Sequence, residues 1–410
     1  MNDQVQTPPA DVLAAAATTP APAPASAAKP KRSRAKAAVA AKGKTAPNPA
    51  TGLIAAIKFV GLAQAKNGTV AETFCHLANQ WAAASNGVLT IATRIEEDLN
   101  ACPQTATFLD ALQRVETDLS ITQISQGFLS VASGDFRGVV PCAPFDQVPI
   151  SPPDDPVAVI DDRLKAAFEA VLKVPNELSP LPHMAGVLLQ AGSVVATNGA
   201  IILEYWHGID LPPNMLVPKV ALQAVLKSGK PLVRFGFSQT SVTFWFEDQS
   251  FIKTQIFAGQ FPAYQNVIEC NYGDMWPVPT DFFKAVAAVA NFSENGSIFF
   301  KNGQVVSNLN DETPSFYKVE GLPEGVGFDG KLLALIADKA SRFLFTEADP
   351  TGRNEIPRLF FVGENLRGVV AGLESKAPAV YRDKADDWSN PGYAQEQRGN
   401  YFDPDDEIPF

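Results

Sequence analysis

The feature that most constrains the fold of this chain is an internal repeat of secondary-structure patterns. Three stretches with a helical period, at 54–66, 161–174 and 279–292, each precede a glycine-centred hairpin pattern. A second helical stretch and then another strand pair follow each hairpin. The hairpins lie at 81–93, 186–198 and 296–308, the second helices at 105–117, 217–230 and 328–342, and the strand pairs within 119–141, 232–256 and 342–373. The order helix, strands, helix, strands is therefore predicted three times, with a period of about 110 residues.

This period has the size of an ordinary domain. We expect an α+β protein with three homologous domains, at 51–150, 151–272 and 273–380. The alternative is that three unrelated α+β segments look alike because helix and hairpin patterns are common. Three occurrences in the same register favour the homologous interpretation.

Two segments of different composition flank the predicted domains. Residues 1–50 hold 25 Ala or Pro, no aromatic residue, and seven basic against two acidic residues. Residues 381–410 hold three basic and eight acidic residues, with little aliphatic content. Neither segment can bury enough apolar surface to offset the entropy of ordering it. We therefore expect a disordered basic arm and a disordered acidic tail.

Composition excludes several classes of protein. The first residues lack the positive and apolar regions of a signal peptide, and no apolar run reaches the ~18 residues of a transmembrane helix. The four cysteines lack paired spacing and the three histidines lack ligand spacing. We therefore expect no disulfide framework, no metal site and no cofactor. The expected location is the cytoplasm, without membrane contact.

The net charge of −11 hides an uneven distribution. The basic arm and the acidic tail cancel, so the predicted domains also carry −11. Their six helical stretches contain 13 Lys or Arg and 8 Asp or Glu, which leaves −16 on the rest of the domains. Positive charge is therefore concentrated on the helices of an otherwise acidic protein.

If the helices share one surface, their basic residues are candidates for contact with a phosphate backbone. These DNA-facing candidates are Lys58, Arg114, Arg163, Lys165, Lys173, Lys219, Lys227, Lys284, Lys331, Lys339 and Arg342. Such contacts would not depend on base sequence. The alternative is that these side chains form the solvated outer faces of amphipathic helices.

The second predicted domain carries three segments that resemble the bacterial-type DNA sliding clamp, the β subunit of the replicative DNA polymerase. The segment 195–199 (Val-Ala-Thr-Asn-Gly) is similar to the clamp's Ala-Thr-Asp-Gly-His-Arg-Leu, 216–219 (Leu-Val-Pro-Lys) to its Val-Pro-Arg/Lys helix start, and 259–268 to its Gly-Arg-Phe-Pro-Asp-Tyr-Arg-Arg-Val. The resemblance covers about 51–380, in the first and third domains by pattern alone. Asn198 replaces the Asp, and Ala200 and Ile201 replace the His-Arg pair. A diverged clamp of viral origin would fit these departures, with the host cytoplasm as its location.

The resemblance implies the clamp fold, in which two three-domain chains form a homodimeric ring around duplex DNA. Helices line such a ring and sheets lie outside. It is not an enzyme, since it holds DNA topologically and keeps a tethered DNA polymerase at high effective concentration. A clamp loader is the further partner that the resemblance implies. The charge distribution described above is what this arrangement requires.

A pocket between the second and third domains, for a short apolar peptide of partner proteins, is also implied. Carried over position by position, its residues are Met184, Thr197, Gly199, Ile202, Pro262, Val267 and Val370. The alternative is that these residues belong to the core. Asn266 stands where the family often has Arg, so the partner specificity is expected to differ.

The last six residues, Asp405, Asp406, Glu407, Ile408, Pro409 and Phe410, resemble the C-terminal peptide of bacterial single-stranded DNA-binding proteins. A terminal Phe can fill an apolar pocket beside a basic residue, while the acidic run adds electrostatic steering. The resemblance implies recruitment of replication or repair proteins that read such tails. The alternative is a tail that only improves solubility.

Two competing functions stay open. A single-stranded DNA-binding protein would use the same acidic tail and would stack bases on the aromatic residues of one hairpin, Phe235, Phe244, Trp245 and Phe246. Such clustering is also typical of a packed core. A purely structural viral protein is the second alternative, and the sequence has no motif for it beyond its strand content.

The sequence at 325–331 matches part of a phosphate loop, but Leu332 stands where Ser or Thr must hold magnesium.

Overall fold

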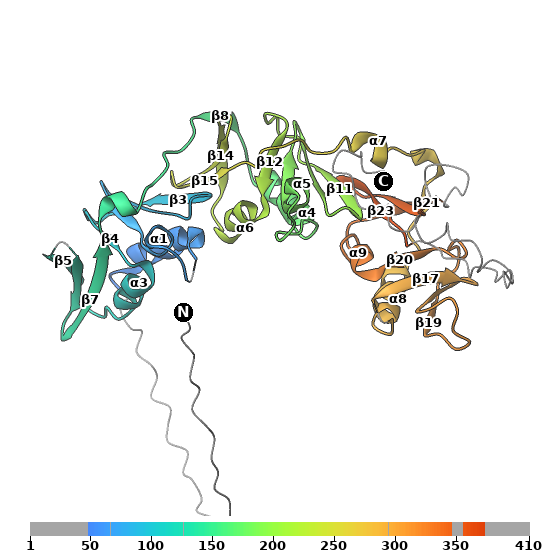
Figure 1. Cartoon of the computed structure of the whole chain (residues 1–410), viewed down its shortest axis with the longest axis horizontal. Coiled ribbons are helices and arrows are strands. Elements are labelled where there is room, and N and C mark those ends of the chain that lie inside the picture. Colours follow the sequence, from blue (N-terminus) through green and yellow to red (C-terminus); the bar gives the residue numbers. More distant parts are fainter. Residues whose placement is uncertain (1–47, 66, 126, 294, 347–355, 374–410) are drawn as a thin grey trace, which may run out of the picture. The chain divides into compact units, whose positions relative to one another are not determined.

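The computed structural model describes residues 48–65, 67–125, 127–293, 295–346 and 356–373. Helices and strands alternate along these residues, which confirms the α+β class (Figure 1). The predicted arm up to residue 47 lies outside the described residues, as does the acidic tail with its last six residues. Among the described helices, none is long and apolar enough to cross a membrane.

The first repeat begins with a helix and a hairpin, at the positions that the sequence predicts. Its helices are α1 (Thr51–Val60), α2 (Val70–Thr73) and α3 (Thr105–Gln113). Its strands are β1 (His76–Ala78), β2 (Trp81–Ser85), β3 (Leu89–Arg94), β4 (Cys102–Pro103), β5 (Ser120–Ser125), β6 (Phe128–Ser133) and β7 (Phe136–Ala143). The β2–β3 turn depends on Gly87, whose φ is +86°, and on the Asn86 side chain, which accepts from Leu89 N at 2.8 Å.

The second repeat follows the same order. Its helices are α4 (Arg163–Val171), α5 (Pro182–Ala185), α6 (Lys219–Lys227) and α7 (Gln265–Ile268). Its strands are β8 (Pro156–Val159), β9 (Gly186–Leu189), β10 (Ser193–Thr197), β11 (Ile201–Trp206), β12 (Met215–Pro218), β13 (Leu232–Phe237), β14 (Ser241–Phe246) and β15 (Phe251–Gln255). Pro218 precedes α6 directly and so stops β12 where the helix begins.

The third repeat has helices α8 (Phe282–Ala290) and α9 (Gly330–Ala334). Its strands are β16 (Trp276–Pro277), β17 (Ser297–Lys301), β18 (Gln304–Val306), β19 (Phe316–Lys318), β20 (Gly327–Asp329), β21 (Arg342–Thr346), β22 (Arg358–Val362) and β23 (Leu366–Ala371). The helix predicted over 328–342 is too long. After α9 the chain continues in tight turns, with Leu335 N bonded to Leu332 O and Ile336 N to Leu333 O, which preserve the apolar spacing without a helix.

The strand pair predicted after each second helix is a set of three strands instead. These sets are β5–β7, β13–β15 and β21–β23. The set β5–β7, for example, contains a turn at Gly134 with φ +52°, and alternating residues alone do not separate strands joined so closely.

The second and third repeats share one strand order, and all three repeats join through their sheets. The second repeat has the order β12-β9-β10-β11 and the third has β20-β17-β18-β19. Pairing of β3 with β15 makes a seven-stranded sheet of the first and second repeats, and pairing of β11 with β23 makes an eight-stranded sheet of the second and third. We call these two pairings the first and second junctions. Two four-stranded sheets, β4-β7-β6-β5 and β19-β18-β17-β20, complete the first and third repeats.

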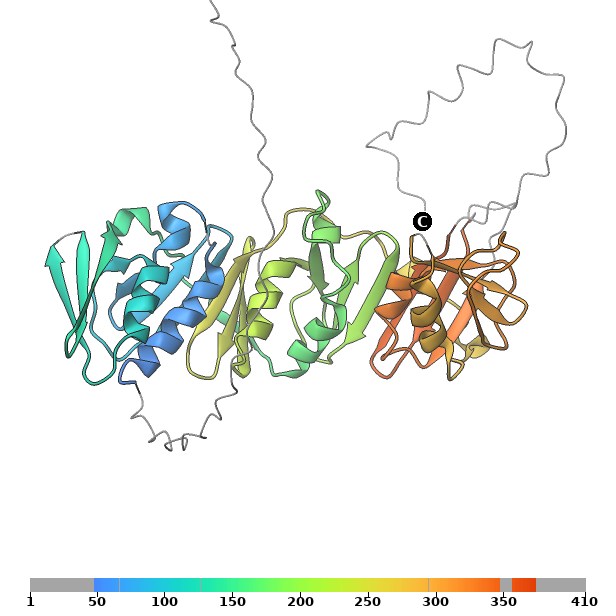
Figure 2. The same ribbon diagram turned by 90° about the horizontal axis from the view of Figure 1, so that it is seen from below.

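Helices cover one face of these sheets, which we call the inner face (Figure 2). In each repeat two helices pack together, α1 with α3, α4 with α6, and α8 with α9. The main core lies between the helices and this face and includes fully buried Phe108, Phe168 and Phe282. Two smaller apolar clusters lie on the opposite, outer face, one at each junction.

Candidate functional site

Exposed basic side chains stand on the helices of all three repeats. They are Lys58 on α1, Lys227 on α6, Lys284 on α8, Lys331 on α9 and Lys173 just after α4. Each of these helices buries its apolar residues toward the sheet, so its lysine faces away from the core. These five predicted DNA-facing residues are therefore accessible to a ligand on the helix-covered side.

Three predicted basic residues gather at the C-terminal end of α4. Lys219 Nζ donates to Pro175 O at 2.7 Å, and Lys339 Nζ, from the third repeat, donates to Ala170 O at 2.7 Å. Burial, and then the neighbouring Lys173, lower the pKa of Lys339. The partial negative charge of a helix C-terminus offsets part of this repulsion. Lys173 and Lys219 also line a hollow of about 510 Å³ beside α4 and α6.

Other predicted basic residues form ion pairs with nearby aspartates. The exposed pairs are Arg114–Asp110 at 3.2 Å, Arg163–Asp161 at 2.9 Å and Lys284–Asp281 at 3.8 Å. Exposed pairs contribute only about 0–1 kcal/mol, so a phosphate could replace the carboxylate. Lys165 differs because its side chain is largely buried, pairs with Asp162 at 3.0 Å and donates to Lys230 O. Lys165 therefore stabilises the fold, and its ammonium group is already engaged by protein atoms.

The structure places Arg342 away from the other basic candidates. This residue begins β21, in which Phe343 and Phe345 point to the inner core and Leu344 packs on the outer cluster. Side chains alternate along a strand, so Arg342 shares the outer face with Leu344. Arg342 is a DNA-facing candidate in the sequence because the predicted helix 328–342 includes it. In the structure the residue belongs to a strand instead.

Four of the predicted peptide-pocket residues lie around the β10–β11 turn. Thr197 and Ile202 are cross-strand partners, and Thr197 Oγ1 accepts from Gly199 N at 3.1 Å. Gly199 has φ +88°, and a Cβ there would lie 2.9 Å from Met184 Cε. Glycine therefore allows both the turn and the close approach of the methionine.

The remaining pocket residues divide between the two faces. Val267 packs against the outer cluster of the second junction, which also contains Ile202, and Pro262 is half-buried in the same segment. Val370, in contrast, is fully buried in the main core. Its neighbour Val369 pairs with Ile202 and belongs to the outer cluster. Val369 therefore occupies the place that the resemblance gave to Val370.

Beside these residues lies a buried polar network that the sequence does not reveal. Glu204, 4% exposed, accepts from Arg367 Nε at 2.8 Å, from Ser193 Oγ at 2.9 Å and from Tyr264 OH at 3.2 Å. Arg367 also donates to Tyr272 OH at 3.2 Å. Burial, followed by the Glu204 carboxylate, raises the pKa of Tyr264, so its hydroxyl stays protonated and donates. The network ties β11, β23 and the segment around α7 together.

The aromatic residues proposed for base stacking are mostly core. Phe235, Phe244 and Phe246 have no exposed surface, so bases cannot stack on them. Trp245 alone points to the outer face, where it contacts Phe251 at a ring-centroid distance of 5.2 Å. The single-stranded DNA-binding alternative thus lacks the platform on which it depended.

Groups suited to metal binding or nucleophilic chemistry are scarce. Across the described residues, no set of three or more His, Cys, Asp or Glu could hold a metal ion. The four cysteines are free thiols. Burial raises the pKa of Cys75 and of Cys102 to about 12, so both stay protonated and unreactive at neutral pH.

Comparison with solved structures finds bacterial sliding clamps. The chain is 18% identical to the Caulobacter crescentus β sliding clamp, with a TM-score of 0.65 over 78% of this chain and 97% of that one. It is 16% identical to a Helicobacter pylori β clamp bound to a DNA ligase peptide, with a TM-score of 0.63 over 78% of this chain and 97% of that one. It is 13% identical to the Pseudomonas aeruginosa DNA polymerase III β subunit, with a TM-score of 0.65 over 79% of this chain and 98% of that one. No family model and no curated protein matches the chain. The chain therefore has the sliding-clamp fold.

Proposed function

We propose that this protein is a DNA sliding clamp, a processivity factor that encircles duplex DNA and tethers a DNA polymerase. The observation that carries the proposal is the position of the basic residues. The exposed lysines of all three repeats stand on the helix-covered side of a fold shared with bacterial clamps. Such a surface attracts phosphate oxygens by charge, so it binds any sequence and permits sliding. The protein acts without a catalytic residue or a cofactor.

The acidic remainder of the chain supports the same function. Residues outside the predicted helices carry most of the negative charge. Acidic surfaces repel a phosphate backbone, so DNA is confined to the lysine-bearing side. The group Lys173, Lys219 and Lys339 adds positive charge at the end of α4. We expect DNA to run past this point.

Two strands that lack a partner from another repeat, among the described residues, favour a homodimer. At each junction a strand of one repeat, β3 or β11, pairs with the last strand of the next, β15 or β23. The equivalent strands β19 and β7 lack such a partner within the described part of the chain. Both expose apolar side chains, with Phe316 55% and Val139 52% exposed. Pairing β19 of each copy with β7 of the other would repeat the two junctions between copies and close a ring.

The outer face around the β10–β11 turn is the site that we assign to partner peptides. Met184, Thr197, Gly199, Ile202 and Val267 border it, with Pro262 in the same segment. The Helicobacter pylori clamp of the comparison binds a DNA ligase peptide. By analogy, this chain would take apolar peptides of its polymerase and clamp loader here. In this proposal the predicted domains 51–150, 151–272 and 273–380 are the three clamp domains, and the acidic tail recruits further proteins.

A covalently closed ring provides the decisive test. Cysteines at Val139 and Phe316 would be linked by a bis-maleimide after dilute protein is concentrated in the presence of plasmid. A linked ring should stay on circular DNA in high salt and leave it after linearisation, because the hold is topological. Each variant with only one of the two added cysteines controls for background linkage, including linkage through the native cysteines. Equal loss from circular and linear DNA, or a monomer at every concentration, would refute the clamp.

Charge reversal tests the DNA-facing surface separately. Lys173→Glu with Lys227→Glu should weaken binding to linear duplex and reduce the slope of log affinity against log salt by about 2, one for each phosphate contact. Arg342→Glu is the control on the outer face, where it reverses one charge against two in the double variant. An unchanged slope in the double variant, or an equal change in Arg342→Glu, would contradict the assignment.

A further inference from the structure

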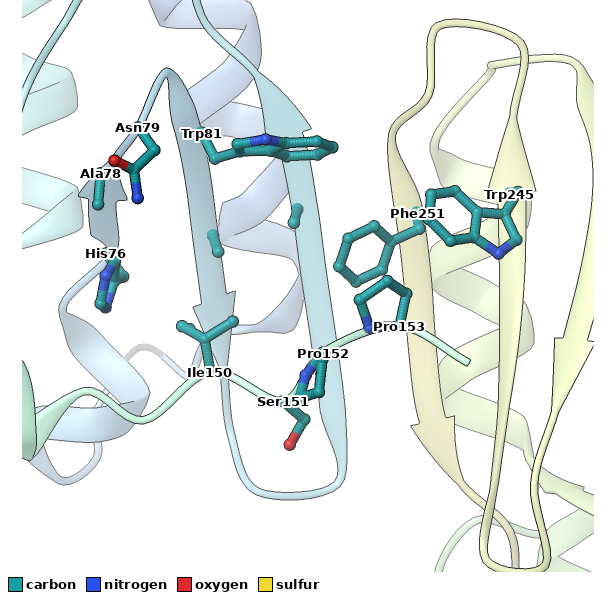
Figure 3. Close-up of a pocket in the computed structure, with 12 residues that line it drawn as sticks. His76, Ala78, Asn79, Trp81, Ile150, Ser151, Pro152, Pro153, Trp245 and Phe251 are labelled. Atoms are coloured by element: carbon teal, nitrogen blue, oxygen red, sulfur yellow. The ribbon is translucent and has the colours of Figure 1, made fainter. Parts of the chain in front are cut away.

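The outer face of the first junction contains an apolar hollow, which we call the trough (Figure 3). Its volume is about 360 Å³. Residues of the first repeat, the second repeat and the segment between them line it. They are His76, Ala78, Asn79, Trp81, Ala83, Ala92, Ile150, Ser151, Pro152, Pro153, Trp245 and Phe251.

Cross-strand pairing explains why a hollow forms here. Ala83, Ala92, Phe251 and Trp245 are successive partners across β2, β3, β15 and β14. The two alanines make a shallow floor beside the large rings of the same face. Trp81 lies 6.2 Å from Phe251 between ring centroids and completes the aromatic wall (Figure 3). Small residues between large ones leave a space that backbone pairing holds open.

Ionic and hydrogen bonds fix the rim of the trough. Asp154, 9% exposed, accepts from Ser241 Oγ and Thr243 Oγ1 at 2.9 Å and from Lys253 Nζ at 3.0 Å. Lys253 Nζ also donates to Pro152 O at 2.8 Å, and Trp245 Nε1 donates to Asp154 O at 3.3 Å. The rim is therefore preformed, and a ligand need not order it.

Cations flank the aromatic wall. The Arg94 guanidinium lies 4.5 Å from the centroid of the Trp81 ring, and that of Arg234 lies 5.6 Å from the centroid of the Trp245 ring. Both arginines are exposed. The site thus combines an apolar, aromatic interior with positive charge at two sides. A ligand that matches it carries apolar side chains beside a cluster of carboxylates.

The chain itself contains such a segment. We propose that the trough binds residues 405–410 of this protein, with Ile408, Pro409 and Phe410 against the aromatic wall and the three preceding carboxylates beside the arginines. Residues 374–410 follow the last described residue, and a chain of that length extends to about 120 Å. Covalent attachment raises the effective concentration of the segment to roughly the millimolar range, so modest affinity suffices. Neither DNA nor a closed ring is needed.

Competing ligands fit the trough less well. A nucleobase would place its hydrogen-bonding edge against apolar surface, which is unfavourable. At the second junction Tyr264 and Ile268 already pack on the corresponding outer face, whereas at the first junction the segment 150–153 borders the hollow without filling it. The trough therefore suits a short peptide end better than a base or a folded domain.

Photo-crosslinking in the full chain tests the proposal. Phe410 would be replaced by benzoylphenylalanine, which retains an aromatic ring, and the adducts mapped by mass spectrometry. Adducts on Trp81, Ile150 or Phe251 are expected. The same crosslinker at Tyr401 is the matched control and should give few adducts in the trough. Adducts centred on Ile202 and Val267, or spread evenly over the surface, would overturn the proposal.

Charge variants sharpen the test without disturbing the fold. Arg94→Glu with Arg234→Glu changes only exposed side chains, and the trough adducts should fall about tenfold. Ala83→Glu should abolish them by placing a carboxylate on the floor, and thermal unfolding would verify that this variant folds. Unchanged adducts in the double arginine variant would overturn the proposal. So would quenching of tryptophan fluorescence by oligothymidine that is equal in the wild type and in Phe410→Ala, since the trough would then be a nucleic-acid site.

Discussion

The two junctions of this protein solve the same packing problem with different side chains. Each pairs two antiparallel strands from neighbouring repeats, and each buries one carboxylate on the outer face beside a cation. At the first junction the pair is Asp154 with Lys253, and at the second it is Glu204 with Arg367. In both, the carboxylate also accepts hydroxyl hydrogen bonds. Both junctions therefore contain a buried ion pair whose carboxylate also accepts hydroxyl hydrogen bonds. We call this arrangement the clasp.

What differs is the apolar surface beside each clasp. The second junction buries Ile202, Tyr264, Ile268 and Phe360 in one cluster, whereas the first has two alanines in the middle of its face. Backbone pairing and a buried ion pair thus suffice to join two repeats. Side-chain size then decides whether the outer face is closed or remains open to a ligand.

The largest effect is expected from breaking the clasp of the second junction. Arg367→Ala leaves the Glu204 carboxylate buried without its cation, and removing one partner of a buried pair costs about 3–5 kcal/mol. Urea unfolding should show this loss. The double variant Glu204→Gln with Arg367→Met removes the buried charge and should recover part of the stability. A loss below about 1 kcal/mol would show that the pair is effectively solvated.

A smaller loss is expected at the first junction. In Lys253→Met the Asp154 carboxylate keeps the hydrogen bonds from Ser241 and Thr243, so the cost should be about 1–3 kcal/mol. Lys253→Arg retains the positive charge and is the control. Urea midpoints of both variants measure the difference. If Lys253→Met were as damaging as Arg367→Ala, the hydroxyl groups would contribute nothing to the clasp.

The first junction should also weaken in acid. Burial alone would raise the pKa of Asp154, but hydrogen bonds from Lys253, Thr243 and Ser241 outweigh burial and hold the pKa below its ordinary value. A lowered pKa stabilises the fold above the unfolded value of about 4, and this contribution disappears as pH falls through the folded value. Asp154→Asn should therefore approach the wild-type unfolding midpoint as pH falls below about 4. A constant difference would mean that Asp154 does not titrate with unfolding.

Filling the trough should have the smallest effect. Ala92→Leu places apolar atoms in an existing hollow and should raise the unfolding free energy by about 0.5–1 kcal/mol. Ala84→Leu is the matched control, because this neighbouring alanine is fully buried in the main core. Overpacking there should cost about 1–3 kcal/mol. Equal changes in both variants would show that the outer face is packed as tightly as the core.

Local patterns were sufficient to predict most of the fold. The hairpins at 81–93, 186–198 and 296–308 carry turn residues with the required conformation, such as Gly87, Gly192 and Gly303 at positive φ. Helical periodicity located five of the six repeat helices closely. It failed at α9, because successive tight turns keep the same apolar spacing as a helix.

Features that depend on register or on distant contacts were not predictable. A resemblance in sequence motif does not fix the register of a strand to the residue. A shift of one residue moves a side chain to the other face of the sheet, as Val369 on the outer face and Val370 in the main core show. Glu204 and Arg367 are 163 residues apart, and no local pattern signals that they meet. Ala83 and Ala92 look unremarkable until β15 is placed beside β3.

The absence of an inter-repeat partner for β7 and β19, among the described residues, gives the terminal repeats a particular weakness. The second repeat has a strand-paired neighbour on both sides, whereas the first and third have one each among the described residues. In an array coupled through nearest neighbours, the end units open most easily. Assembly of two copies would supply the missing neighbours, so the unfolding midpoint would rise with protein concentration. Simple dilution would then expose the first and third repeats as the least stable parts of the molecule.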